Sequence, residues 1–378
     1  MNARWVKTGL LVLIVKCLLP DTSSAVEPAQ DMVSMGYNFY DGGGVTVQGP
    51  AVIVQKKLKN RLSLKASSRL DLVSSASVDA VTQASRFRED RKENALGVNF
   101  LKDDILVGIG YIHSLESDYT SNTLSASLDH DLLDKNVTLH FRFGRSWDEV
   151  GKNGDPSFGW KNLDRTVFTA GFSQILSPQW LIQFNYEMTA DSGFINSPYR
   201  SVLTLDGGTF PENYPESRTG HAWLTRTTYG FFPDSKDAGG SDPKSSIQLD
   251  YRYYDDTFGM NSHTGKILFQ HYWRSNRIAG FYYQYYRQGD ANFYGDRLPS
   301  TQLYKARDRD LSRFSDHWIG GSLKVKPRDW PVKWLKNPFM EFGYSFVIFN
   351  YDNFTDPRTG KLYEQESHVL HTSVGFNY

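Results

Sequence analysis

Large apolar residues alternate with polar or small residues along most of this chain. In 136–146, for example, Val137 and Leu139 alternate with Thr138 and His140. The same period of two recurs in later segments, at 179–189, 245–255 and 337–349. A period of two places successive side chains on opposite faces of an extended chain. The pattern therefore predicts β-strands that each have one apolar and one polar face.

This pattern predicts about 16 strands, most of them close to the length that crosses a membrane at a tilt. The predicted strands are 32–40, 45–57, 61–73, 94–101, 105–113, 121–129, 136–146, 164–176, 179–189, 219–231, 245–255, 261–273, 278–287, 311–325, 337–349 and 366–378. Long and short connections alternate between them on average. Short periplasmic turns and long extracellular loops are typical of outer-membrane barrels. With an even number of strands, the N-terminus and the C-terminus of the barrel domain both lie on the periplasmic side.

These features favour an all-β fold, a transmembrane antiparallel up-and-down β-barrel. In lipid every backbone N–H and C=O needs a partner within the protein, so a sheet must close on itself. The apolar face then meets lipid and the polar face lines the lumen. The aromatic content of 15% fits the girdles at the two membrane interfaces. The competing fold is a secreted all-β propeller or sandwich, which rarely alternates its loop lengths in this way.

The first 25 residues differ from the rest of the chain. Arg4 and Lys7 precede an apolar run, and small residues end at Ala25. This order predicts a signal peptide, 1–25, cleaved after Ala25, followed by one barrel domain, 26–378. The only cysteine, Cys17, lies within the predicted signal. The chain is therefore expected in the bacterial outer membrane and without disulfides. Its formal net charge of zero shows no basic excess, so nucleic acid is not an expected partner.

Several blocks resemble a family of uncharacterised bacterial outer-membrane β-barrel proteins that is defined as a domain of unknown function. The blocks are "DGGGVTVQGPAVIVQK" (41–56), "DLVSSASVDAVTQAS" (71–85), "ESDYTSNT" (116–123), "WDEVGKNGDP" (147–156), "NSPYRSV" (196–202), "YRYYDDTFGMNSHT" (251–264) and "ARDRDLSRFSDH" (306–317). The resemblance implies an exported barrel with no known activity. It also implies a link to an envelope redox or transport system with a flavin-transferring enzyme. One departure is the final Tyr378, where such barrels more often end in Phe.

Most of these blocks fall in the predicted extracellular loops and the adjoining strand ends. Charged residues of both signs would meet there, at the mouth, where they could pair or form a constriction. The candidate mouth residues are Asp71, Asp79, Glu116, Asp118, Asp148, Glu149, Asp155, Arg200, Asp256, His263, Arg307, Arg309, Arg313 and His317.

Other charged residues occupy the polar face of predicted strands. A charge on the lipid face near mid-membrane is costly, whereas a charge in the lumen can be hydrated or paired. The candidate lumen residues are His140, Arg142, Glu187, Asp250, Arg252 and Glu341. Their mixed signs predict no selective ring of one charge.

Signals for chemistry are weak. His368 and His371 are three residues apart, which on a strand places them on opposite faces rather than on one metal. Asp148, Glu149 and Asp155 share a loop but match no calcium-loop spacing. Asp256 could lie beside His263 in a rim acid–base dyad, with a structural hydrogen bond as the alternative. No catalytic, cofactor or metal site is predicted, and an enzyme is not expected.

The last residues continue the alternation to the end of the chain. Leu370, Val374, Phe376 and Tyr378 are apolar with polar residues between them. This resembles the terminal signal that barrel-assembly machinery recognises. We expect this strand to pair with 32–40 and close the barrel.

Three functions remain open. A barrel of about 16 strands can leave an aqueous channel, so a pore or transport component with an unknown solute comes first. A receptor, scaffold or partner subunit comes second, because 190–218 and 288–310 are long enough to fill the lumen. A rim hydrolase that uses Asp256 and His263 comes third.

Overall fold

The computed structural model describes residues 26, 30–75, 87–231, 244–273, 276–327, 330–332 and 334–378. The predicted signal peptide, 1–25, and the candidate mouth residue Asp79 lie outside the described residues. Both therefore stay predictions from the sequence.

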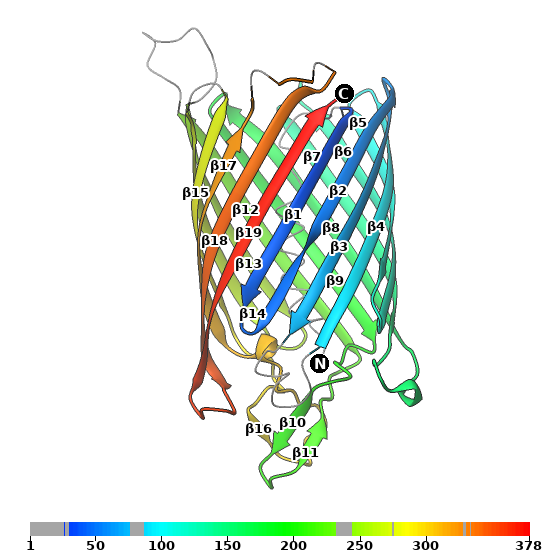
Figure 1. Cartoon of the computed structure of the whole chain (residues 1–378), viewed down its shortest axis with the longest axis vertical. Coiled ribbons are helices and arrows are strands. Elements are labelled where there is room, and N and C mark those ends of the chain that lie inside the picture. Colours follow the sequence, from blue (N-terminus) through cyan, green and yellow to red (C-terminus); the bar gives the residue numbers. More distant parts are fainter. Residues whose placement is uncertain are drawn as a thin grey trace.

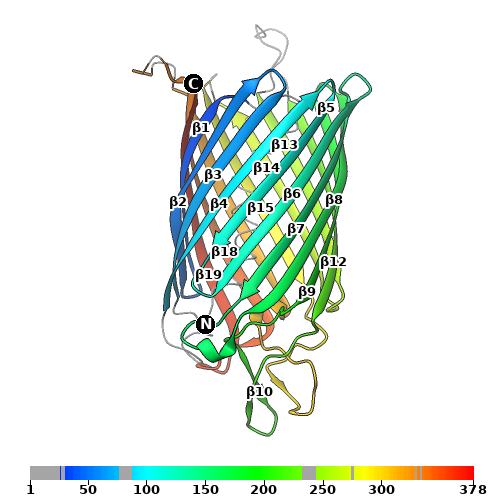
Figure 2. The same cartoon turned by 90° about the vertical axis from the view of Figure 1, so that its right-hand side faces the viewer.

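Sixteen antiparallel strands form one closed barrel, as Figures 1 and 2 show. The barrel strands are β1 (Met32–Gly42), β2 (Val45–Lys59), β3 (Leu62–Ser75), β4 (Phe87–Lys102), β5 (Ile105–Leu115), β6 (Tyr119–Leu132), β7 (Val137–Val150), β8 (Lys161–Ser177), β9 (Trp180–Gly193), β12 (Ser217–Phe231), β13 (Ser245–Asp256), β14 (Asn261–Tyr272), β15 (Arg277–Gln288), β17 (Phe314–Val325), β18 (Lys336–Thr355) and β19 (Leu362–Asn377). The predicted fold class and strand number are confirmed.

The strand boundaries differ from the prediction mainly at the extracellular ends. β4 begins at Phe87 rather than at 94, and β18 continues to Thr355 rather than ending at 349. β17 begins at Phe314 rather than at Leu311, because Arg309–Leu311 forms the short 3-10 helix η2. Above the membrane neither face of a strand needs to be apolar, so the alternation fades before the pairing ends.

Strand alternation separates a lipid-facing surface from a lumen-facing surface. The outer face exposes large apolar side chains along the strands, such as Leu96, Ile109 and Phe281. Exposed tryptophans lie near both ends of the barrel, with Trp147 toward the long loops and Trp273 beside a short turn. An exposed apolar belt with aromatic residues at both rims is the surface that a bilayer covers. Among the described residues, no helix is long and apolar enough to cross a membrane.

The predicted seam of the barrel is confirmed. β1 pairs with β19 in one register from Met32↔Asn377 to Gly42↔Ser367. Tyr378 follows directly, and its hydroxyl lies 3.4 Å from the carbonyl oxygen of Gln55 on β2. Figure 1 places this end of the chain among the short turns, at the periplasmic end of the predicted topology.

Two long connections at the opposite end carry a second, smaller sheet. It comprises β10 (Ser201–Thr204), β11 (Thr209–Pro211) and β16 (Arg297–Leu298), in the order β11-β10-β16. Figure 1 shows it projecting beyond the barrel wall at the end with the long loops. We call residues 194–216 and 289–313 together the cap. The sequence pattern predicts no strands there, because the pieces are too short to show a period.

Candidate functional site

A hydrophobic core lies across the extracellular mouth, inside the ring of strand ends. Its loop members include Tyr214 and Phe293 from the two halves of the cap, and Phe258 from the β13–β14 loop. The ring centroids of Phe258 and Phe293 are 4.9 Å apart in an edge-to-face contact. Inward-facing strand residues such as Val150 join the same core. The cap therefore packs as a folded layer over the mouth.

A buried ion pair joins the two halves of the cap. The Arg200 guanidinium contacts the Asp308 carboxylate, and their side chains are only 4% and 1% exposed. Glu212 adds a second link: its Oε1 accepts from the backbone N–H of Arg307 at 2.7 Å, and its Oε2 accepts from the Tyr214 hydroxyl at 2.6 Å. Burial, together with the Glu212 carboxylate, raises the pKa of the Tyr214 phenol well above its ordinary value, so this hydroxyl stays a donor.

The cap is also bonded to the strand ends around the barrel. Arg307 Nη2 donates to the carbonyl oxygen of Thr355 at the end of β18, at 2.7 Å. Arg309 Nη1 lies 3.3 Å from Gln365 Oε1 on β19. On the far side, the Tyr199 hydroxyl donates to Asp118 Oδ2 in the β5–β6 loop at 2.5 Å. Bonds to β18, to β19 and to the β5–β6 loop hold the cap across the mouth.

Four candidate mouth carboxylates lie below the cap, two on the inner wall and two at the rim. Asp71 on β3 pairs with Arg69 at 2.9 Å, and both side chains are buried. Asp148 on β7 accepts from the hydroxyls of Tyr119 and Ser121. Glu116 and Asp118 lie together with Glu89 at the rim, with one ligand atom of each within 4.8 Å of the others. Arg91 Nε is 3.7 Å from Glu116, so this acidic group has a cation beside it.

The proposed dyad of Asp256 and His263 is wrong. Asp256 faces inward, and its fully buried side chain pairs with Arg218 at 2.5 Å. His263 lies on the lipid-facing side of β14 and bonds to the Tyr251 hydroxyl at 2.8 Å. Strand parity separates them, because Asp256 and His263 project from opposite faces of the barrel wall.

Four further mouth candidates also lie away from the inner wall. His317 is on the outer face of β17 and bonds to the Tyr283 hydroxyl at 2.8 Å. Glu149 is exposed on the outer face of β7. Asp155, in an outer loop, accepts from Ser157 at 2.5 Å, which holds the pKa of its carboxyl below the ordinary value. Arg313 is an exposed cap residue that pairs with Asp290 at 2.8 Å.

Strand alternation directs the side chains of all six candidate lumen residues inward. Arg226 and Asp250 form a bidentate pair, with two N–H···O bonds of 2.9 Å. Asp129 bonds to His140 at 2.8 Å and to Arg142 at 2.6 Å. The remaining cross-strand pairs are Arg252 with Glu187 at 3.9 Å and Lys324 with Glu341 at 3.4 Å. Each of these cations has an anion as its neighbour.

We expect Arg226→Met to destabilise the barrel, because it leaves Asp250 partly buried without its bidentate partner. The expected loss is about 1–3 kcal/mol, measured as a lower urea midpoint of the purified protein in lipid vesicles. The double variant with Asp250→Leu removes both charges and should lose less than the single variant. If the single variant is as stable as the unaltered protein, the pair contributes nothing.

The sequence reasoning missed several residues that hold the cap together. Glu212, Tyr214 and Asp308 lie in the long connections, where no periodic signal marks an inward direction. The available signal was composition. Aromatic residues such as Phe293 are unusual in a solvated loop and indicate that the loop packs on something.

Comparison with known proteins finds one family model that matches part of the chain. Residues 159–322 match the model of a family described as "Protein of unknown function (DUF3570)". Among curated proteins, none matches this chain.

Three solved structures of similar architecture are a bacterial polysaccharide outer-membrane secretin, OccD3 (OpdP) of Pseudomonas aeruginosa and OpdK of Pseudomonas aeruginosa with vanillate. The secretin is 9% identical with a TM-score of 0.49, over 93% of this chain and 99% of that chain. OccD3 is 10% identical with a TM-score of 0.48, over 94% and 93% of the two chains. OpdK is 7% identical with a TM-score of 0.45, over 92% and 98%.

The closed barrel, its exposed apolar belt and its two aromatic rims define an outer-membrane protein. The expected resemblance is confirmed as well: over residues 159–322 this outer-membrane barrel matches an uncharacterised family of unknown function.

Proposed function

We propose that this protein is a gated transport component of the outer membrane. Its polar lumen is the path of a hydrophilic solute, and its cap controls the extracellular entrance. The observation that carries this proposal is the combination of a 16-strand barrel with charged, inward-facing pairs below a cap that packs across the mouth. Barrels of 16–18 strands are wide enough for an aqueous channel.

The chemistry of the lumen supports a polar solute that carries no large net charge. Arg226 with Asp250, and Arg142 with Asp129, present both signs at neighbouring positions. Paired charges offer hydrogen-bond donors and acceptors without a net field of one sign. A neutral or zwitterionic solute with several hydroxyl or amide groups fits such a wall better than a hydrocarbon.

A second candidate is a receptor or partner subunit that does not conduct. The packing of the cap favours this alternative, because a buried ion pair and an aromatic core make a stable layer over the mouth. In that case the outer surface of the cap, rather than the lumen, is the functional surface.

Recordings of the purified protein in planar bilayers test the proposal. The transport proposal predicts discrete current steps of low open probability, because the cap spans the mouth. It also predicts that weakening the cap makes these steps frequent. A folded sample that remains silent at all voltages, both unaltered and with a weakened cap, would overturn transport and favour the receptor.

A further inference from the structure

Val26, the first residue after the predicted cleavage site, is buried against the inner wall of the barrel. It is 8% exposed, and its backbone nitrogen lies 2.8 Å from Asp131 Oδ2. Asp131 projects inward near the periplasmic end of β6, one residue before that strand ends. Strands β2 to β5 separate β6 from β1, where the barrel begins. Residue 26 therefore contacts the barrel far from the seam.

Among the described residues, no side-chain cation pairs with Asp131. The carboxylate is 4% exposed, and its other oxygen accepts from the Thr138 hydroxyl at 2.7 Å. Within the described part of the chain, no ion pair joins Asp131 to a lysine, arginine or histidine. The neighbouring Asp129 differs, because His140 and Arg142 both bond to it. A buried carboxylate without a cation is costly, so the site favours a positive group at the position of the Val26 nitrogen.

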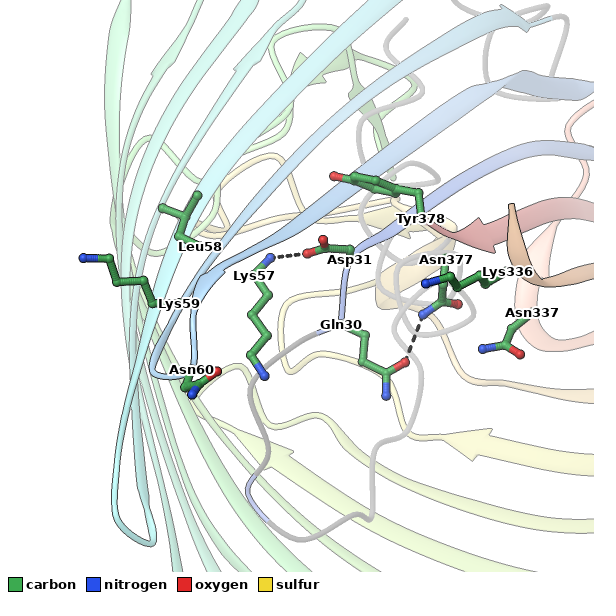
Figure 3. Close-up of a pocket in the computed structure, with 10 residues that line it drawn as sticks. All are labelled: Gln30, Asp31, Lys57, Leu58, Lys59, Asn60, Lys336, Asn337, Asn377 and Tyr378. Carbon is green, nitrogen blue, oxygen red and sulfur yellow. Dashed lines mark hydrogen bonds between the residues drawn. The ribbon is translucent and has the colours of Figure 1, made fainter. Parts of the chain in front are cut away.

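The chain is also fixed just after this contact, where it enters β1. Figure 3 shows Gln30 beside Asn377 and Asp31 beside Lys57 at the periplasmic rim. Asn377 Nδ2 donates to Gln30 Oε1 at 2.9 Å. Asp31 accepts from the backbone N–H of Lys57 at 2.6 Å and from Lys56 Nζ at 2.7 Å. Residues 30 and 31 are thus bonded to the seam, while residue 26 is bonded to β6.

We propose that Asp131 is the binding site for the α-ammonium group of the mature N-terminus. Hydrolysis of the Ala25–Val26 peptide bond by a signal peptidase adds one water, which leaves a carboxylate on Ala25 and an amine on Val26. The amine takes up a proton near neutral pH, since α-amino groups have pKa values of about 7.7–8.0. The amide N–H at this position is a single neutral donor. The new ammonium carries three donors and a charge that neutralises Asp131.

Binding of the new N-terminus at this site requires that the signal peptide is cleaved before the barrel folds. In the folded barrel Val26 is only 8% exposed against the inner wall, so its nitrogen is not accessible to a membrane-bound protease. Cleavage therefore precedes closure of the barrel. The new ammonium group then binds Asp131 and holds the first residue of the mature chain against β6.

Reductive methylation of the intact protein tests the proposal. The protein is isolated from membranes, its N-terminus is identified by mass spectrometry, and it is treated with formaldehyde and cyanoborohydride at several pH values. Pairing with Asp131 should raise the pKa of the Val26 amine by at least about one unit. The folded protein should then react ~10-fold more slowly at neutral pH than the heat-unfolded protein.

Asp131→Asn should return the rate toward the unfolded value. Asp129→Asn is the matched control, since it removes an inward carboxylate from the same strand and should leave the rate slow. Folding of each variant is checked by its faster migration in SDS gels before boiling. If Asp131→Asn does not fold, the pH dependence of methylation in the unaltered protein decides alone. A mature chain that begins elsewhere, an amine that reacts as fast folded as unfolded, or a folded Asp131→Asn protein that stays slow would overturn the proposal.

Discussion

Arg200→Ala should convert a mostly closed barrel into one that conducts frequently. The substitution leaves Asp308 buried and unpaired between the two halves of the cap, where its side chain is 1% exposed. Loss of one partner of a buried pair costs about 3–5 kcal/mol when the group stays buried. If about 2 kcal/mol of this loss acts on the equilibrium between closed and open cap, the open population rises about 30-fold.

The measurement is single-channel recording in planar bilayers, with swelling of protein-loaded vesicles in a neutral sugar as a second readout. Arg313→Ala is the matched control, because it removes an arginine from the same cap. Its pair with Asp290 is exposed, at 50% and 30%, and is worth about 0–1 kcal/mol. Equal open probability in the two variants would show that the Arg200–Asp308 pair does not hold the entrance closed. Silence in a folded Arg200→Ala protein would count against a gated lumen.

The barrel was predictable from the sequence because lipid imposes a strict pattern. Each membrane-crossing strand must present an apolar face to acyl chains. Alternation in segments such as 136–146 therefore indicates where a strand lies, which of its faces meets lipid, and its pairing register. The seam was predictable from the same pattern. The alternating apolar residues that end at Tyr378 belong to a terminal strand, and this strand needs a partner to close the barrel. The turn between β1 and β2 contains Gly43 and Gly44, whose positive φ angles of 59° and 74° favour glycine.

The cap was not predictable in the same way. Its residues face no lipid. The order of polar and apolar residues therefore depends on local packing and shows no regular period. Tyr214, Glu212 and Asp308 are brought together only by the crossing of two connections that are far apart in sequence. The motif-based mouth residues were therefore only partly right. Arg200 and Arg307 lie in the cap. His263 and His317 lie on the outer face, as the alternation of side chains along their strands would have indicated.

Deleting Phe376–Tyr378 should largely prevent assembly of the barrel in the outer membrane. The deletion removes the pairs Val33↔Phe376 and Met32↔Asn377 at the seam, and Asn377 also pairs with Lys336 on β18. Both neighbours of β19 then lose partners at the membrane boundary, where each unsatisfied backbone group costs several kcal/mol. The terminal aromatic residues are also the group that we propose the assembly machinery recognises. The expected result is a drop of at least ~10-fold in the heat-modifiable, folded form recovered from outer membranes, measured by gel shift and immunoblot.

Trp273→Ala is the control, because it removes an exposed aromatic side chain at the same end of the barrel but outside the seam. The truncated chain should accumulate in the periplasm or be degraded, while the control assembles normally. Normal amounts of folded, heat-modifiable protein after the truncation would mean that the seam closes without its last residues and that the terminal pattern is no assembly signal.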